Sequence, residues 1–95
     1  MSEKIAIIGS GLIGRAWAIS FARAGYNVHM TDKNKQALSK SSNLLQSSLR
    51  DLATHKLLND QSVEMVAERV TSQTSIEATL EGAIYVQENT AEVLE

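Results

Sequence analysis

The sequence of 95 residues contains no cysteine and no proline. The lack of cysteine excludes a disulfide framework and a thiolate metal site. Without proline, tight turns depend on Gly, Asn, Asp and Ser, which favours long helices joined to short strands. The start of the chain also lacks the combination of basic residues, a long apolar stretch and a small-residue cleavage site that marks a secretory signal. We therefore expect a cytoplasmic protein.

An excess of charge of one sign is missing as well. The chain has 9 Lys and Arg against 11 Asp and Glu, spread along its length. Proteins that bind nucleic acid or an anionic membrane usually gather basic residues in blocks, so we expect neither partner. The only 2 histidines stand apart from any cluster of acids at metal-ligand spacing, which argues against a metal site. A small-molecule cofactor and substrate are the expected partners.

Hydrophobic periodicity predicts an α/β fold in a chain long enough for one domain or a piece of one. Short, mostly apolar or alternating segments predict strands at residues 4–8, 27–31, 70–72 and 83–87. Helical spacing predicts helices at residues 12–24, 34–58, 63–70 and 74–80, the last from a capping-box pattern at its start. A break near Asn59 and Asp60 turns the second and third helices into a helical hairpin. The strand at 83–87 is expected to be buried on its faces and to leave an unprotected edge.

Three glycines lie between the first strand and the first helix, in the sequence GSGLIG. Gly9 is expected to make the tight turn out of the strand, and Gly11 to let the backbone approach a pyrophosphate. Gly14 is expected to let the helix pack closely on the strands. The free amides at the start of the helix then face the phosphates. The pattern predicts a Rossmann-type parallel sheet, here partial with about four strands and the inserted helical hairpin.

Asp32 closes the second strand and indicates which cofactor binds. A carboxylate there accepts hydrogen bonds from ribose hydroxyls and repels a 2′-phosphate, which favours NAD over NADP. Lys33 and Lys35 follow at once and soften that discrimination. The same glycines also serve FAD, so an FAD-binding module remains an alternative. The other alternative is that the glycines only turn and pack, with Asp32 a solvated strand end.

Three segments carry a resemblance to a known family: GSGLIGRAWA at 9–18, FARAGYNVHMTD at 21–32 and EGAIYVQENTAEVLE at 81–95. Together they resemble the N-terminal part of the 3-hydroxyacyl-CoA dehydrogenase family, and within it most closely the branch that holds lambda-crystallin and L-gulonate 3-dehydrogenase. The resemblance spans the whole chain. It implies NAD-dependent oxidation of the secondary hydroxyl of a 3-hydroxyacyl-CoA or a 3-hydroxy acid such as L-gulonate, by a full-length protein that is a homodimer.

The resemblance also implies which residues hold the cofactor. These are the loop at 9–14, in which Leu12 and Ile13 match residues whose backbone covers the pyrophosphate, together with Asp32. Glu92 matches an acid just beyond the fourth strand. The family's catalytic His–Glu pair, with its supporting Ser and Asn, lies downstream, and no residue here matches it. Residues 1–95 are thus expected to be the N-terminal portion of a dinucleotide-binding domain, truncated before the substrate domain and inactive alone. A truncated, non-enzymatic, crystallin-like protein is the alternative.

A few other residues have a plain structural interpretation. His29 and His55 are expected to be structural or surface residues, neither with an acid at a spacing that implies a catalytic pair. Trp17 is expected to pack in the core rather than stack on a cofactor. Glu88 ends a strand near the expected site, where it either helps to position Glu92 or is only solvated.

Overall fold

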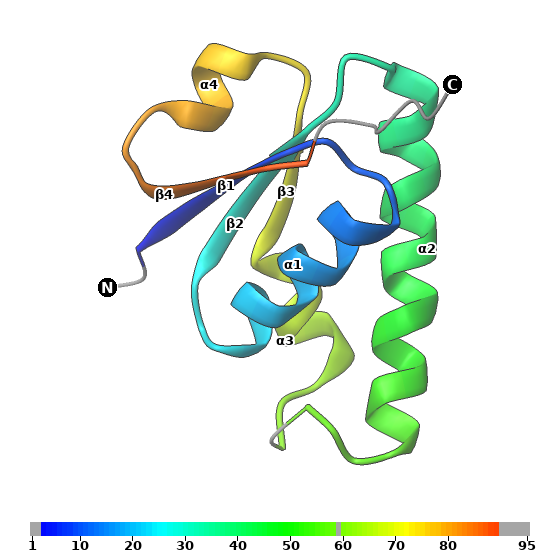
Figure 1. Ribbon diagram of the computed structural model, residues 1–95. Helices are drawn as coiled ribbons and strands as arrows, with labels where there is room; N and C mark the ends of the chain where they lie inside the picture. The colour runs from blue at the N-terminus through cyan, green and yellow to red at the C-terminus, as the bar shows by residue number, and fades with distance from the viewer. Residues whose placement is uncertain (1–2, 59, 90–95) are drawn as a thin grey trace.

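In the computed structural model, a parallel sheet of four strands is covered by helices on both faces (Figure 1). The structure describes residues 3–58 and 60–89. The strands are β1 (Lys4–Ile8), β2 (Asn27–Thr31), β3 (Val70–Gln73) and β4 (Ala83–Glu88). The helices are α1 (Leu12–Arg23), α2 (Lys35–Thr54), α3 (Val63–Glu68) and α4 (Ile76–Leu80).

The strand order is β3-β2-β1-β4, with every pair parallel. The chain therefore winds in one direction from β1 through β2 to β3 and then crosses back to place β4 on the other side of β1. This reversal between β1 and β4 is where open α/β sheets bind ligands, at the carboxyl ends of the strands. The predicted Rossmann-type parallel sheet of about four strands is confirmed.

The core lies between the sheet and the three helices on one of its faces. Figure 1 shows α1, α2 and α3 on that side and α4 on the other. β1 is a central strand that is covered on both faces. Its apolar residues 5–7 are accordingly all buried. The core cluster comprises Ile5, Ile7, Ala18, Ala22, Val28, Met30, Leu38, Leu45, Leu49, Leu58 and Val66.

The helical hairpin is formed by α2 and α3. The α2 helix begins at a conventional cap, since the Asn34 side chain accepts hydrogen bonds from the amides of Gln36 and Ala37. It ends at Thr54, four residues before the predicted end, because Lys56 has a positive φ of 59° that a helix cannot contain. Asp60 also has a positive φ within the predicted break, whereas Asn59 lies outside the described residues.

Three smaller predictions were wrong. The cap of α4 is Ser75, whose Oγ accepts from the amide of Ala78, one residue later than the predicted capping box places it. The strand β4 is not buried, since it lies at the edge of the sheet and Ile84 is 57% exposed. Trp17 is not in the core: it is 41% exposed and stacks on Phe21 with ring centroids 5.7 Å apart.

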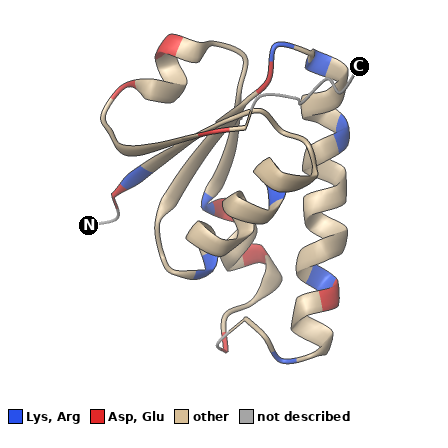
Figure 2. Ribbon diagram, viewed as in Figure 1, with Lys and Arg blue, Asp and Glu red and all other residues tan. Residues whose placement is uncertain are grey.

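Charged residues are dispersed over the molecule (Figure 2): α2 carries both basic and acidic side chains, whereas α4 carries an acid and no base. Across residues 3–58 and 60–89, no helix combines the length and the apolar character needed to cross a membrane.

Candidate functional site

The loop between β1 and α1 lies at the carboxyl edge of the sheet, between the ends of β2 and β4. The amide of Gly9 donates to the carbonyl oxygen of Thr31 at 2.8 Å, which joins the loop to the end of β2. On the other side, the amide of Asn89 donates to the carbonyl oxygen of Ile8 at 2.7 Å, which joins it to the end of β4. The loop thus sits at the point where the strand order reverses.

Two of the loop glycines are required by close packing. Gly9 has a φ of +98°, and a Cβ there would lie 2.2 Å from the backbone oxygen of Asn89. A Cβ on Gly14 would lie 1.9 Å from the carbonyl oxygen of Gly9. Real side chains do not come so close, so the first turn of α1 rests directly on the end of β1.

Gly11 is free of such contacts and faces open space. A Cβ built on it meets no atom within 4 Å. It is the N-cap of α1, yet no side chain caps the helix and no acid lies in its first turn. The following side chains do not cover the backbone either, since Leu12 is 74% and Ile13 63% exposed. The amides at the start of this 12-residue helix are therefore left available for an anion, which the helix dipole also favours.

Asp32 directs its carboxylate at this loop. Its Oδ2 accepts from the backbone amide of Ser10 at 2.8 Å and from the Ser10 hydroxyl at 2.9 Å. Its Oδ1 accepts from the amide of Asn34 at 2.9 Å. Partial burial acts to raise the pKa of Asp32, but these hydrogen bonds and the nearby charge of Lys33 outweigh it and hold the pKa below its ordinary value. The acid is thus ionised at neutral pH and fixed beside the glycines.

Beyond β4, the structure describes only part of the predicted site. Glu92, expected to contact the cofactor, lies outside the described residues. Glu88 is exposed at the end of β4, in register with Ile8. Asn89, which sequence reasoning missed, packs its side chain over Gly9, with its Cβ 3.4 Å from the place a Gly9 Cβ would take. Its position one residue past a parallel strand was the signal that could have found it.

Ser10 was also missed. It lies between two glycines of the motif and is only 1% exposed, and its hydroxyl is committed to Asp32. No local pattern in the sequence links residues that are 22 positions apart. The only available signal was that β1 and β2 are adjacent parallel strands, so that the residues following each of them meet at one edge of the sheet.

His29 lies within the sheet, away from the carboxyl edge. Its Nδ1 accepts a hydrogen bond from the side-chain amide of Gln73 at 2.8 Å. Burial lowers the pKa of His29, and the positive charge of Lys4 lowers it further. A neutral, hydrogen-bonded imidazole on a middle strand agrees with the structural role expected for it.

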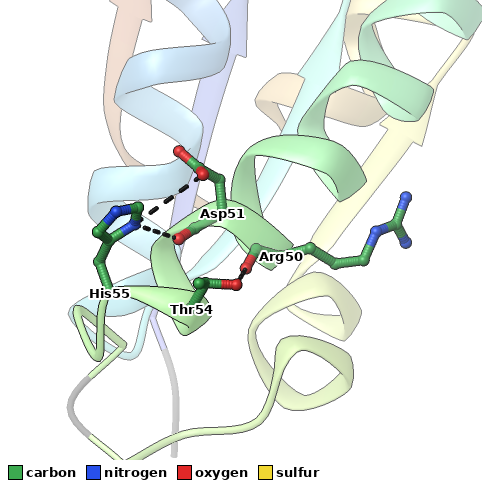
Figure 3. A network of polar contacts seen from close by, with 4 residues as sticks. All are labelled: Arg50, Asp51, Thr54 and His55. Carbon is green, nitrogen blue, oxygen red and sulfur yellow. Dashed lines mark hydrogen bonds and ion pairs between the residues drawn. The ribbon is translucent and has the colours of Figure 1, made fainter.

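His55 is the C-cap of α2, at the end of the helix remote from Asp32. Figure 3 shows it beside Asp51 on the last turn. Its Nδ1–H donates to the carbonyl oxygen of Asp51 at 2.9 Å and lies 3.9 Å from the Asp51 carboxylate. Asp51 is thus an acid near His55, four residues away on the same helix, and the pair is exposed and remote from the glycine loop. Both side chains are exposed on the last turn, where the backbone amide and the imidazole of His55 both donate to the Asp51 carbonyl oxygen, so His55 has a capping role.

A separate hollow of about 370 Å³ lies between α2 and the end of β3. None of the loop glycines lines it, and neither does Asp32. Its lining residues are Lys35, Leu38, Ser39, Ser42, Asn43, Ser72 and Thr74. In the part of the chain that the structure describes, no group of three or more His, Cys, Asp or Glu is placed to hold a metal ion.

Comparison with known proteins places this geometry in a family. Residues 4–95 match the family described as 3-hydroxyacyl-CoA dehydrogenase, NAD binding domain. The lambda-crystallin homolog of Homo sapiens is 32% identical over 92 residues, a match that covers 96% of this chain and 29% of that protein. The homolog of Mus musculus is 30% identical over the same shares. The chain thus spans less than a third of the length of these relatives.

Solved structures agree. The 3-hydroxybutyryl-CoA dehydrogenase of Escherichia coli K12 superposes with a TM-score of 0.84 at 28% identity, over 98% of this chain and 20% of that one. The (S)-3-hydroxybutyryl-CoA dehydrogenase PaaH1 of Ralstonia eutropha has a TM-score of 0.84 at 26% identity, over 99% of this chain and 33% of that one. The family that matches is defined by NAD binding, which decides for NAD over FAD.

Proposed function

Because the chain belongs to the 3-hydroxyacyl-CoA dehydrogenase family through its NAD-binding domain, we propose that it holds NAD for hydride transfer from a secondary hydroxyl. The substrate class is a 3-hydroxyacyl-CoA or a 3-hydroxy acid such as L-gulonate. Among its relatives, two solved structures are named as 3-hydroxybutyryl-CoA dehydrogenases, which supports a hydroxyl on the third carbon.

The observation that carries this proposal is an open helix start beside a fixed carboxylate. The first turn of α1 has no cap and no covering side chain, while Asp32 lies one hydrogen bond away from the same loop. An anionic pyrophosphate suits the first and a ribose diol the second. We infer that the backbone from Gly11 to Gly14 binds the pyrophosphate and that Leu12 and Ile13 border it. When bound, NAD supplies the hydride acceptor.

Discrimination against NADP follows from the charge on Asp32. Its pKa is held below the ordinary value, so the carboxylate is negative over the whole physiological range. A 2′-phosphate placed beside it meets like charge in a partly buried setting. Lys33 and Lys35 flank the acid in sequence and reduce this repulsion, so we infer a preference for NAD rather than absolute exclusion of NADP.

Proton transfer is not assigned to any residue of this chain. His29 is bonded to Gln73 within the sheet, and His55 caps the far end of α2. A helix of 20 residues is about 30 Å long, which separates His55 from the loop by most of the length of the molecule. We infer that residues 1–95 bind the cofactor as the N-terminal portion of a dinucleotide-binding domain. The chain covers less than a third of its relatives' length, which supports a division between cofactor binding here and catalysis elsewhere.

We extend the proposal to a longer form of the protein that is a cytoplasmic homodimer. We also propose Glu92 as a further cofactor contact.

Calorimetric titration with NADH tests the proposal. We expect saturable binding of one NADH per chain and weaker binding of NADPH. Asp32→Ala should weaken NADH binding by at least about tenfold, which corresponds to about 1.4 kcal/mol and matches the loss of hydrogen bonds to a charged group. Asp51→Ala removes an exposed carboxylate at the other end of α2 and should leave binding unchanged. No binding by a folded sample, or equal binding by Asp32→Ala, contradicts the proposal.

A further inference from the structure

Ser10 is the one residue of the glycine loop whose side chain turns inward. It is 1% exposed, while Gly11 faces open space and Leu12 is largely exposed. A buried hydroxyl needs a hydrogen-bond partner, because an unpaired one costs about 1–3 kcal/mol. Ser10 meets this need by donating to Asp32 Oδ2 at 2.9 Å.

The partner of this hydroxyl is informative because the residue lies next to the start of a helix. A serine at the start of a helix ordinarily accepts from an amide of the first turn. Here the N-cap position falls on Gly11, one residue later, and α1 has no side-chain cap. The Ser10 hydroxyl therefore does not cap the helix amides. It donates instead to Asp32, at the end of β2.

The hydrogen bonds divide the two oxygens of Asp32 into distinct roles. Oδ2 accepts from both the amide and the hydroxyl of Ser10, whereas Oδ1 accepts from the Asn34 amide. A carboxylate offers about four acceptor positions, two on each oxygen. Among the described residues, Ser10 thus fills both positions on Oδ2, and a position on Oδ1 remains for a ligand.

Resting on the NAD-binding function proposed above, we propose that Ser10 is a positioning residue for the cofactor: its buried hydroxyl holds Asp32 so that one fixed oxygen, Oδ1, meets the adenosine ribose of NAD. A carboxylate that is already immobile loses little freedom when it binds a hydroxyl, which strengthens the contact. The same immobility prevents Asp32 from turning away from a 2′-phosphate. Ser10 thereby contributes both to affinity for NAD and to selection against NADP.

The proposal differs from a purely structural role in what Ser10→Ala does to two ligands. If the hydroxyl only supported the loop, its loss would weaken the binding of NADH and of NADPH equally, since both ligands place a pyrophosphate on the loop. If the hydroxyl acts through Asp32, its loss should weaken NADH binding by about three- to tenfold, the net size of one ordinary hydrogen bond, and should weaken NADPH binding by less. The ratio of the two dissociation constants should therefore shrink.

A double-mutant cycle provides the direct test. Asp32→Ala removes both carboxylate oxygens and leaves the Ser10 hydroxyl with no acid to hold. In that background Ser10→Ala should change NADH affinity by less than about twofold, because the carboxylate through which Ser10 acts is gone. Ser72→Ala, which removes an exposed hydroxyl paired with Ser42, is the matched control and should have no effect in either background.

A measurement without ligand accompanies the cycle. In the free protein, NMR titration of the Asp32 carboxyl should show that Ser10→Ala raises its pKa towards the ordinary value, since one of the hydrogen bonds that lower it is lost. If Ser10→Ala does not fold, Ser10→Cys replaces the hydroxyl with a slightly larger thiol that is only a weak donor, and it should show the same changes.

The outcomes separate the two proposals. Failure of the folded wild-type chain to bind NADH overturns the proposed function. Binding by the wild type, with equal losses for NADH and NADPH in Ser10→Ala or the same loss in the Asp32→Ala background, overturns the role of Ser10 alone. An unchanged pKa of Asp32 in Ser10→Ala also overturns it.

Discussion

The carbonyl oxygen of Gly9 lies so close to Gly14 that a Cβ on Gly14 would come within 1.9 Å of it. No rotamer relieves such a contact, because the backbone fixes the position of a Cβ and the oxygen is itself a backbone atom. The first turn of α1 can therefore pack on the end of β1 only because Gly14 has no side chain. This packing of Gly14 on Gly9 sets the orientation of the first helix amides.

Gly14→Ala should destabilise the fold by about 2 kcal/mol or more, because the methyl group forces α1 away from the end of β1. Urea denaturation followed by circular dichroism measures this change as a lower midpoint. A free energy of unfolding within about 0.5 kcal/mol of the wild type would show that the loop is not packed as described.

Gly11→Ala is the matched substitution with the opposite expectation. Gly11 has a φ of −69°, which alanine adopts freely, and open space beside it. The free energy of unfolding should change by no more than about 1 kcal/mol, the cost of alanine at an N-cap. NADH binding should weaken by about tenfold, since the methyl group occupies space that a bound pyrophosphate needs. Calorimetry that finds the wild-type affinity in this variant would place the cofactor elsewhere.

The protonation of His29 should make the fold less stable in acid. Its pKa in the folded chain lies below the ordinary value of 6.5, so between these two values the unfolded chain binds more protons. Stability contributed by the neutral imidazole is complete above the unfolded pKa and declines as the pH falls through that window. Denaturation at pH 7.5 and pH 5.5 measures the decline, and His29→Gln, which cannot be protonated, should reduce it. An equal decline in His29→Gln would assign the effect to other groups.

The strand β4 should mediate self-association of the purified chain. It forms one edge of the described sheet, and Ile84, Tyr85 and Val86 on it are all exposed. The strand contains no lysine or proline, residues that commonly block pairing with a second copy, and its register irregularity is confined to its start, between Ala83 and Tyr85. Light scattering should therefore show a mass that rises with concentration, and Val86→Lys should suppress the rise. A monomer at every concentration tested would count against pairing through this edge.

Much of the fold could be predicted because its signals are local. The apolar run of β1, the alternation of β2 and the spacing of α1 each belong to one segment, and parallel pairing followed from their order. Burial was harder to predict. Whether an apolar residue is covered depends on which element lies next to it, and for Ile84 and Trp17 no element covers the outer side. The start of α4 was misplaced by one residue because Thr74 and Ser75 can both cap a helix.

In the candidate site, too, residues with a local signal could be predicted and residues defined by distant contacts could not. The three glycines and Asp32 could be identified because each has a backbone or charge requirement that few residue types satisfy. Ser10 and Asn89 could not, since their roles arise from contacts with partners 22 and 81 positions away. A serine in a glycine loop and an asparagine after a strand are common, and only the meeting of parallel strand ends gives them significance.

The central claim is that the start of α1 binds the pyrophosphate of NAD, and amide chemical shifts test it most directly. Addition of NADH to isotopically labelled protein should move the backbone amides of residues 11–14 most strongly, together with those of Ser10 and Asn34, which donate to Asp32. Shifts confined to the hollow between α2 and β3, or no shifts in residues 11–14 at saturating NADH, would contradict the claim.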